Sequence, residues 1–454
     1  MAYTETTTRS YGSRVKNSFS GMLFGFVIFI AGTVLLWWNE GNAVKTDKML
    51  NEAQGVCVDM EDVSKVNPEF EGKMVHATAE AVTKDSIDFA AFGVGANAIA
   101  LSKSVKYYQW VEHKKEQRKD KIGGGEEIIT TFTYTKEWVN KPINSNNFSD
   151  PEYKSRFNTP VITTENEKIY ASTVTFGAYT LPESMVQSIS GSSPAYPQPT
   201  DEMLKEWDQS IKIYRAQNNL RLYEEKVDVD AQTMKNIAAQ ADSAKSDSAK
   251  VDSAKVETPA TVEPAPELNN KYEATYVHVV DNQLYFGYNP AVPEIGDVII
   301  TFDKVDQGTI SILAMVEGSS FKKFTAKNGK SLLTVSRGEV SMDQMFQNQH
   351  DANTMWTWVL RILGVMLVIG GLKGIFGILT TLLKVLPFLA SIMNFGVGLI
   401  CSVVGFVWSL LVIAIAWLFY RPIIGIIILA LAGGLIFFYV SKGKKKKAAA
   451  EVAE

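Results

Sequence analysis

Few residues in this chain have the types and spacing that catalysis or metal binding requires. The sequence contains four histidines: His76, His113, His278 and His350. None of them belongs to an HExxH motif or another metal-binding spacing. Cys57 has no neighbouring histidine, and three acidic residues follow it: Asp59, Glu61 and Asp62. Their charges disfavour a thiolate, so the sequence predicts no activated nucleophile, no metal and no cofactor.

Two other patterns imitate catalytic sites but lack the context that such sites need. Residues 93–98 (GVGANA) resemble a dinucleotide-binding turn, but no parallel strand precedes them and no acidic ribose ligand follows. Glu80, Asp85 and Asp88 could supply a pair of catalytic carboxylates, yet such pairs on a highly charged domain are usually solvated. We therefore expect a glycine-rich turn and an exposed acidic surface. The sequence indicates a protein that is not an enzyme.

The apolar residues gather near the two ends of the chain instead of recurring along it. One block covers residues 20–38, and the others lie between residues 356 and 440. Long apolar segments with few charges are typical of membrane-spanning helices. The net charge of −4 gives no reason to expect nucleic-acid binding. The chain is predicted to be a multi-pass α-helical membrane protein with one large polar domain.

Charges beside the apolar blocks predict the number and direction of the spans. The four expected transmembrane helices are residues 20–38, 356–372, 396–419 and 423–440. Arg9, Arg14 and Lys16 precede the first span, and a lysine cluster follows the last. Because positive flanks stay in the cytoplasm, both termini are expected there, as an N-terminal segment 1–19 and a basic tail 441–454. A cleaved signal peptide is the less favoured alternative for the first block.

The apolar stretch between the second and third spans is interrupted by Lys384 and Pro387. We therefore expect residues 373–395 to form a cytoplasmic interfacial or re-entrant segment rather than a span. Arg361 is expected to extend from the second span towards the interface. The lysines predicted to face the lipid surface are Lys373, Lys384, Lys442, Lys444, Lys445, Lys446 and Lys447.

The polar domain is predicted to be extracytoplasmic and to have two parts, residues 39–235 and 269–355. Alternating apolar residues and a helical period give the expected elements: strands within 105–112, 128–138, 168–181 and 298–316, and a helix over 201–225. Residues 236–268 carry the Asp-Ser-Ala-Lys repeats and a proline-rich run, so they are expected to be a flexible insert. The fold class is an α+β domain, mainly antiparallel β, attached to four spans.

Several short motifs together resemble the transmembrane protein 43 family, also called LUMA. The motif residues are Asn39, Glu40, Gly41, Tyr108, Gln109, Trp110, Glu112, Glu137, Trp138, Gly296, Asp297, Trp417, Tyr420, Arg421 and Pro422. The resemblance implies four spans, a large luminal domain, cytoplasmic termini and no enzymatic activity. Animal members reside in the endoplasmic reticulum and inner nuclear membrane, whereas a bacterial member would reside in the inner (plasma) membrane.

The expected function is that of a non-enzymatic membrane scaffold acting through the polar domain. Membrane lipids, other membrane proteins and further copies of the chain are the expected partners, and nucleic acid is not. The alternative is a transport or lipid-handling protein, because the apolar segment with Lys384 and Pro387 could line a lipid-accessible cleft.

Overall fold

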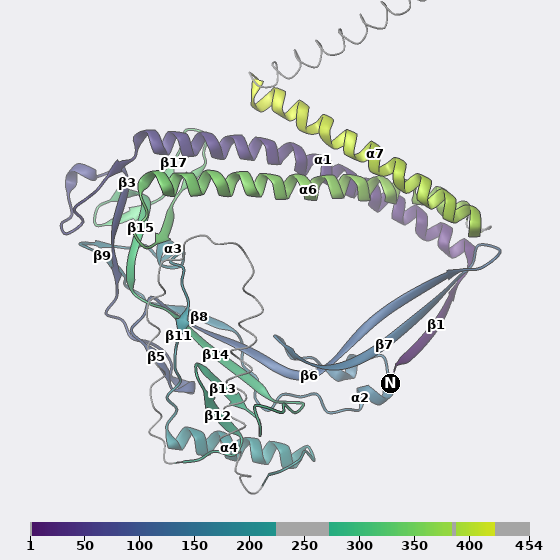
Figure 1. Cartoon of the computed structure of the whole chain (residues 1–454), viewed down its shortest axis with the longest axis horizontal. Helices are drawn as coiled ribbons and strands as arrows, with labels where there is room; N and C mark the ends of the chain where they lie inside the picture. The colour runs from purple at the N-terminus through teal and green to yellow at the C-terminus, as the bar shows by residue number, and fades with distance from the viewer. Residues whose placement is uncertain (1, 224–271, 384–386, 423–454) are drawn as a thin grey trace, which may run out of the picture.

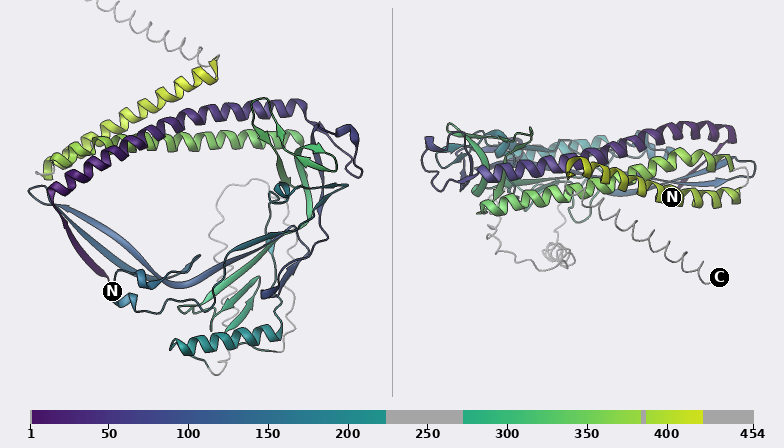
Figure 2. Two further views of the ribbon diagram at one scale, coloured as in Figure 1. Left: turned by 180° about the vertical axis from the view of Figure 1, so that it is seen from behind. Right: turned by 90° about the horizontal axis from the view of Figure 1, so that it is seen from above.

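The computed structural model describes residues 2–223, 272–383 and 387–422. Three features predicted from the sequence lie outside these residues: the fourth span at 423–440, the insert at 236–268 and the basic tail at 441–454. Lys384, Lys442 and Lys444–Lys447 lie outside them too. Seen from above in Figure 2, the described helices and sheets form a thin layer.

Three long helices lie along one edge of this layer (Figure 1): α1 (Tyr11–Val56), α6 (Met342–Leu382) and α7 (Pro387–Tyr420). In the described part of the chain, three helices are long and apolar enough to cross a membrane. Most of the apolar side chains in these windows are exposed, which suits contact with lipid rather than a water-facing bundle. The structure thus agrees with the first three predicted spans.

Glycines allow α1 and α6 to pack closely. A Cβ atom on Gly25 would lie 2.7 Å from the backbone nitrogen of Ile375, and one on Gly32 would lie 2.9 Å from that of Val368. Small residues at such contacts bring helix backbones together and increase dispersion contacts, as in many membrane bundles. Farther towards the start of α1, Ser18 Oγ donates a 2.8 Å hydrogen bond to Thr381 Oγ1.

The helices are longer than the predicted spans. Residues 39–56, expected to begin the strand-rich domain, continue α1, because Met49, Leu50 and Ala53 follow a helical period and pack into a buried cluster. At the other side of the bundle, α6 continues to Leu382 and stays against α1. The described residues of the predicted segment 373–395 extend α6 and begin α7, and their interfacial or re-entrant position stays a prediction.

The polar domain contains an eight-stranded antiparallel sheet. Its strands in spatial order are β1 (Tyr3–Arg9), β7 (Glu126–Val139), β6 (Ala100–Asp120), β14 (Val298–Val305), β13 (Gln283–Phe286) and β12 (Val277–Val280), with β8 (Glu167–Tyr170) beside β6 and β11 (Ser193–Pro194) beside β14. One face is covered by α4 (Asp201–Gln217), whose N-terminus is capped by Thr200. Trp207 of α4 packs against Phe286 in this sheet.

A seven-stranded sheet lies closer to the helices. Its strands are β10 (Tyr179–Thr180), β9 (Thr175–Phe176), β3 (Met74–Val82), β15 (Gly308–Glu317) and β16 (Ser320–Lys322), with β19 (Thr334–Arg337) beside β15 and β2 (Val58–Asp59) beside β3. The remaining short elements are β4 (Ile87–Phe89), β5 (Val94–Ala96), β17 (Phe324–Thr325), β18 (Ser331–Leu332), α2 (Pro151–Lys154) and α3 (Glu183–Val186). Pairing is antiparallel except between β2 and β3, so the mainly antiparallel α+β domain is confirmed.

Both sheets combine strands from the two sides of the insert. β14 pairs with β6, and β15 pairs with β3, so residues beyond 272 complete sheets begun before residue 140. The two predicted parts of the domain are therefore one folded unit around shared cores rather than two independent domains.

The chain's N-terminal segment belongs to the domain sheet. β1 pairs in antiparallel register with residues 126–132 of β7, and Tyr3 packs on Phe132 with ring centroids 6.0 Å apart. Arg14 at the start of α1 holds the tip of the β6–β7 hairpin: its Nη1 donates to the carbonyl of Gly124 at 2.9 Å, and its Nη2 to Asp120 at 2.6 Å. Figure 1 shows the hairpin reaching this end of α1.

The predicted topology placed residues 1–19 and the β6–β7 hairpin on opposite sides of a membrane, whereas β1 and β7 pair in the structure. Arg14 is not a free flanking charge: it is buried and ion-paired with Asp120, and Glu126 lies 3.9 Å away. The cytoplasmic position of the termini stays a prediction.

We predict that cysteines placed at Thr6 and Ile129 form a disulfide in intact membranes, because the two positions face each other in the β1–β7 ladder. The background chain carries Cys57→Ser and Cys401→Ala. Oxidation should keep the two fragments joined after protease cleavage between the two positions.

Cysteines at Thr6 and Thr133 are the matched control, since they are out of register by about 13 Å along the strand. Joined fragments in the control alone, or in neither variant, would contradict the pairing of β1 with β7.

Candidate functional site

The Asn39-Glu40-Gly41 motif, which follows the first apolar block, contacts the motif at residues 417–422, at the end of the third predicted span. Glu40, which is 2% exposed, accepts two hydrogen bonds from Arg361: Nε to Oε1 at 2.6 Å and Nη2 to Oε2 at 2.8 Å. Trp417 Nε1 also donates to Glu40 Oε2, at 2.7 Å. The carboxylate thus joins α1, α6 and α7 in one place. We call Glu40, Arg361 and Trp417 the helix charge cluster.

Neighbouring motif residues close the packing around this cluster. Asn39 Nδ2 donates to the carbonyl of Thr357 at 3.0 Å. Gly41 leaves room for the ring of Tyr420, because a Cβ atom there would lie 2.6 Å from the ring's Cζ. The motif Asn39-Glu40-Gly41 therefore contacts both of the other long helices.

Arg361, expected to extend towards the interface, is bound by side chains of the helix bundle. Its guanidinium lies between the rings of Trp358 and Trp417, with its Cζ 4.9 and 5.5 Å from their centroids. A bidentate carboxylate and two aromatic faces satisfy a guanidinium better than solvent exposure beside an apolar surface would. No partner of Arg361 was predicted, because Glu40 is 321 residues away along the chain.

A second ion pair lies one to two turns farther along α1. Arg421 Nη2 is 3.3 Å from Asp47 Oδ2, and His350 Nδ1 is 3.2 Å from Asp47 Oδ1. Arg421 therefore binds α1. Pro422 follows it and is exposed.

The motifs of the polar domain meet around a buried aspartate, Asp297, whose side chain is fully buried. Its Oδ2 accepts hydrogen bonds from the Tyr285 hydroxyl at 2.5 Å and from the backbone nitrogen of Glu294 at 2.8 Å. Nη1 of Arg215 lies 3.7 Å from its Oδ1. Arg215 also pairs with Glu294. We call Asp297, Arg215, Tyr285 and Glu294 the domain charge cluster.

The strand motif of β6 lies beside this cluster. Tyr108 exchanges backbone hydrogen bonds with the Gly296-Asp297 turn, both at 2.9 Å. Gly296 has φ +101°, a conformation that favours glycine. A Cβ atom at this position would also lie too close to the carbonyl oxygen of Thr159. Trp138 packs between Tyr108 and Tyr285, with centroid distances of 5.1 and 6.3 Å. The motif residues therefore support Asp297 rather than a reaction centre.

Three further motif residues of this strand pair have separate structural roles. The buried amide of Gln109 accepts a 2.8 Å hydrogen bond from the backbone of Ile143. Glu112 accepts bonds of 2.5 Å from both the backbone of Ser149 and the hydroxyl of Tyr134. Glu137 is on the surface and pairs with His113 at 2.8 Å. Trp110 lines a cavity described below.

Burial changes the acid–base behaviour of the domain charge cluster. Desolvation raises the pKa of Asp297 to about 6, although hydrogen bonds from Glu294 and Tyr285 and the charge of Arg215 oppose that shift. The same burial, with the nearby Asp297 charge, raises the pKa of Tyr285. Asp297 therefore titrates in a range where an exposed carboxyl is already ionised.

The patterns that imitated catalytic sites have structural explanations. Burial raises the pKa of the Cys57 thiol to about 12, and Asp59 adds to this. Asp85 accepts hydrogen bonds from the backbones of Ser172 and Thr173, at 2.7 and 2.9 Å. Gly93 forms a tight turn with φ +64° and lies against the backbone of Gln198. Among the described residues, no group of three or more His, Cys, Asp or Glu could hold a metal ion.

Comparisons with known proteins identify the family. The sequence profile described as Transmembrane protein 43 matches residues 107–422. The chain belongs to the transmembrane protein 43 family. Transmembrane protein 43 from Homo sapiens is 26% identical over 454 residues, covering 95% of each chain. The Transmembrane protein 43 homolog from Drosophila melanogaster is 23% identical over 428 residues, covering 92% of this chain and 94% of the relative. No solved structure matches significantly.

Sequence reasoning did not find Arg215 or Tyr285. A signal for Arg215 was present: Asp208 and Arg215 share the helix face of Leu204 and Ile211, and all four side chains are buried in α4. Charged residues within an apolar helical stripe indicate buried partners. Of the lysines predicted to face lipid, Lys373 is described, and it lines a cavity between α6 and α7.

Removing the charge of Glu40 should destabilise the helix bundle. Glu40→Gln leaves Arg361 between two tryptophan rings without its counter-charge, which should cost about 3–5 kcal/mol. The double variant with Arg361→Met should recover most of this loss, because neutral side chains need no paired charge. Unfolding of the detergent-solubilised chain by sodium dodecyl sulfate measures both.

The control is Glu137→Gln, which removes the exposed pair with His113 and should change stability little, because water screens exposed ion pairs. If Glu40→Gln lowers stability no more than this control does, the helix charge cluster does not stabilise the bundle.

The stability of the polar domain should fall as pH rises from about 4 to about 6. The pKa of Asp297 is higher in the folded domain than the ordinary aspartate value of 3.8, so the folded state binds more protons in this range. The contribution is largest while the carboxyl is protonated and is lost as pH rises through about 6, with a slope of at most about 1.4 kcal/mol per pH unit. Denaturant midpoints followed by tryptophan fluorescence measure it.

Asp297→Asn should remove this component of the pH dependence, whereas Asp281→Asn, at an exposed turn, should keep it. If stability changes with pH equally steeply in the wild type and in Asp297→Asn, Asp297 does not titrate in this range.

Proposed function

We propose that this protein is a non-enzymatic membrane scaffold that organises membrane protein complexes through its polar domain. The buried charges of both clusters are paired within the fold and are arranged to hold elements together. Scaffolding needs a stable surface at a fixed position, and it needs no reaction centre. Other membrane proteins and further copies of the chain are the proposed partners.

One observation carries this proposal: the helices continue into the core of the domain. Met49 and Leu50 of α1 and Met345 and Phe346 of α6 are buried in the same cluster as Leu313 of β15. His76 of β3 also contacts the segment before α6, through a 2.8 Å interaction with the carbonyl of Val340. A domain attached through a shared core cannot rotate freely on its membrane anchor, which favours lateral assembly in a fixed orientation.

Photo-cross-linking in intact membranes tests the proposal. A photoreactive residue at exposed domain positions, for example Lys106 or Lys323, should give specific adducts with other membrane proteins or with a second copy. The same residue at Leu23, which is 66% exposed on α1 within the apolar block, reports contacts made through the bilayer. A monomeric purified chain that gives no domain adduct in cells would contradict the scaffold.

A lipid-handling role is the second candidate. It is supported by a cavity of about 230 Å³ between α6 and α7, lined by Lys373, Gly377, Thr380, Val397 and Gly398. A lysine beside glycines at a helix contact suits a lipid head group. Lys373→Gln would then reduce co-purified anionic lipid without changing domain adducts, and an unchanged lipid content would exclude the role.

The membrane of residence is also a proposal. Relatives bear the name transmembrane protein, and the apolar helices suit integral membrane attachment. We propose the endoplasmic reticulum or inner nuclear membrane for a eukaryotic chain and the inner membrane for a bacterial one.

A further inference from the structure

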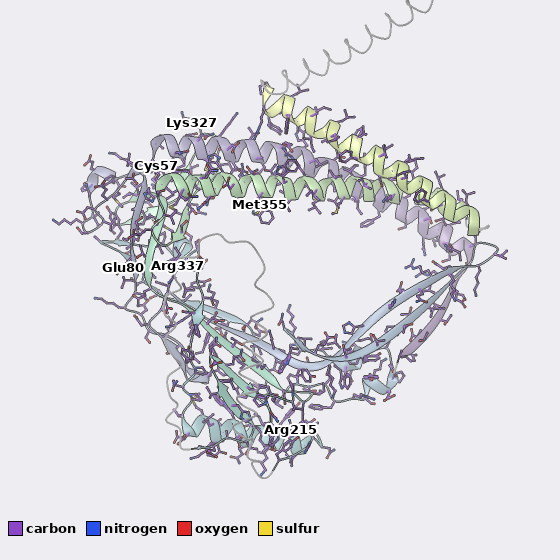
Figure 3. The ribbon with its side chains drawn as sticks, in the orientation of Figure 1. Cys57, Glu80, Arg215, Lys327, Arg337 and Met355 are labelled. Carbon is purple, nitrogen blue, oxygen red and sulfur yellow. The ribbon has the colours of Figure 1, made fainter. Side chains whose placement is uncertain are left out.

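The polar domain contains an open cavity of about 530 Å³ beside the domain charge cluster. It forms where β6, β7, the segment after α2, the end of α4 and the turn before β14 meet. Its lining residues are Trp110, Lys136, Arg156, Phe157, Arg215, Leu220, Arg221, Val292, Pro293, Glu294 and Ile295. Figure 3 labels Arg215 at this place, on the side of the domain away from the long helices.

Positive charge predominates in the lining, with four cationic residues and one carboxylate. The carboxylate is Glu294, and it is held by Arg215 and by the Tyr223 hydroxyl at 3.0 Å. It therefore does not neutralise the exposed cations Lys136 and Arg221, which form no ion pair among the described residues. These two charges are available to an anion.

The same lining offers an aromatic and aliphatic surface. Trp110 is half-buried at the base of the cavity, and the Lys136 ammonium lies 5.2 Å from its ring centroid. Val292, another residue of the lining, is 64% exposed. Arg156 is fixed over Trp110 and Tyr153, at 5.4 and 4.1 Å. Cations around a partly exposed tryptophan suit a ligand that carries both negative charge and an apolar group.

We propose that this cavity binds an acidic peptide segment of a partner protein. Carboxylates of the segment pair with Lys136 and Arg221, and an aromatic or aliphatic side chain packs against Trp110 and Val292. The inference rests on the proposed scaffold function and names the chemistry of the partner.

Other occupants fit the position and the charge less well. A lipid bilayer would be at the long helices, whereas the cavity is on the opposite side of the domain (Figure 3). Nucleic acid needs a basic surface that follows several phosphates, while the chain carries a net charge of −4 and the cations here surround one small cavity. An acidic segment with one apolar anchor matches the size and the charge.

Fluorescence anisotropy of labelled peptides on the purified full-length chain in detergent tests the proposal. The probe is a short peptide of glutamates with a central phenylalanine; one comparison peptide replaces phenylalanine by glycine, and another replaces the glutamates by lysines. The wild type should bind the probe most tightly, and binding should weaken at least about tenfold when salt rises from about 50 to about 300 mM.

The variant Lys136→Glu with Arg221→Glu should reduce the affinity for the probe at least about tenfold, because it reverses the two available charges. The matched control is Lys106→Glu with Lys323→Glu, which makes the same change of charge at exposed positions outside the cavity. The control should keep the affinity of the wild type. Trp110→Leu should reduce the preference for phenylalanine over glycine.

Equal loss in the cavity variant and the control would overturn the proposal, as would equal binding of the lysine peptide. Complete displacement of the probe by millimolar inorganic phosphate would show a small-anion site instead. Selective binding of vesicles containing anionic phospholipid through Lys136 and Arg221 would also overturn it. A chain that lacks residues 236–268 distinguishes an external partner from the insert. Binding of the probe only after this deletion would show that the insert occupies the cavity.

The peptide experiment can fail without contradicting the proposed scaffold function. Domain adducts in cells that persist unchanged in the Lys136→Glu/Arg221→Glu variant would keep the scaffold and exclude this cavity as its docking site. No domain adducts in the wild type would contradict the scaffold itself.

Discussion

The antiparallel contact between α1 and α6 determines how the rest of the chain can fold. It extends from Gln54 beside Asp343 at one end to Tyr11 beside Leu382 at the other. In α1, 46 residues give a helix of about 69 Å, longer than the hydrocarbon core of a bilayer. Because of this excess length, one part of each helix belongs to the apolar bundle and another part packs in the polar domain. Glycine contacts hold the apolar part, and the domain core holds the polar part.

The helix charge cluster lies between these two parts. Glu40 brings together Arg361 and Trp417 from helices that are distant in the sequence. A buried ion pair is costly to desolvate, so its main effect is to fix which residues meet rather than to add net stability. A sliding of α1 against α6 by one turn would separate Glu40 from Arg361 while leaving mostly apolar contacts possible. The pair therefore sets the register of the bundle and, through it, the position of the domain.

The domain uses buried charge in a comparable way. Asp297 and Arg215 connect the start of β14 to the end of α4, and neither residue is near the other in sequence. Because Arg215 also holds Glu294, the exposed cations of the neighbouring cavity remain uncompensated. The core arrangement and the surface charge are thus linked by a single arginine. At the opposite end of the layer, Arg14 connects α1 to the β6–β7 hairpin through the same kind of contact.

The sequence alone determined the features that depend on local composition and period. It predicted the apolar segments, the alternating strands of β7, β14 and β15 and the family motifs, because each of these depends on residues that are neighbours in the sequence. Only the tertiary structure showed the partners of Glu40, Asp297 and Arg14. Their ion pairs join residues between 82 and 321 positions apart, and no periodicity encodes such distances. The same limit explains the N-terminal segment: flanking charge was readable from sequence, but the pairing of β1 with β7, which decides where those charges lie, depends on the folded hairpin.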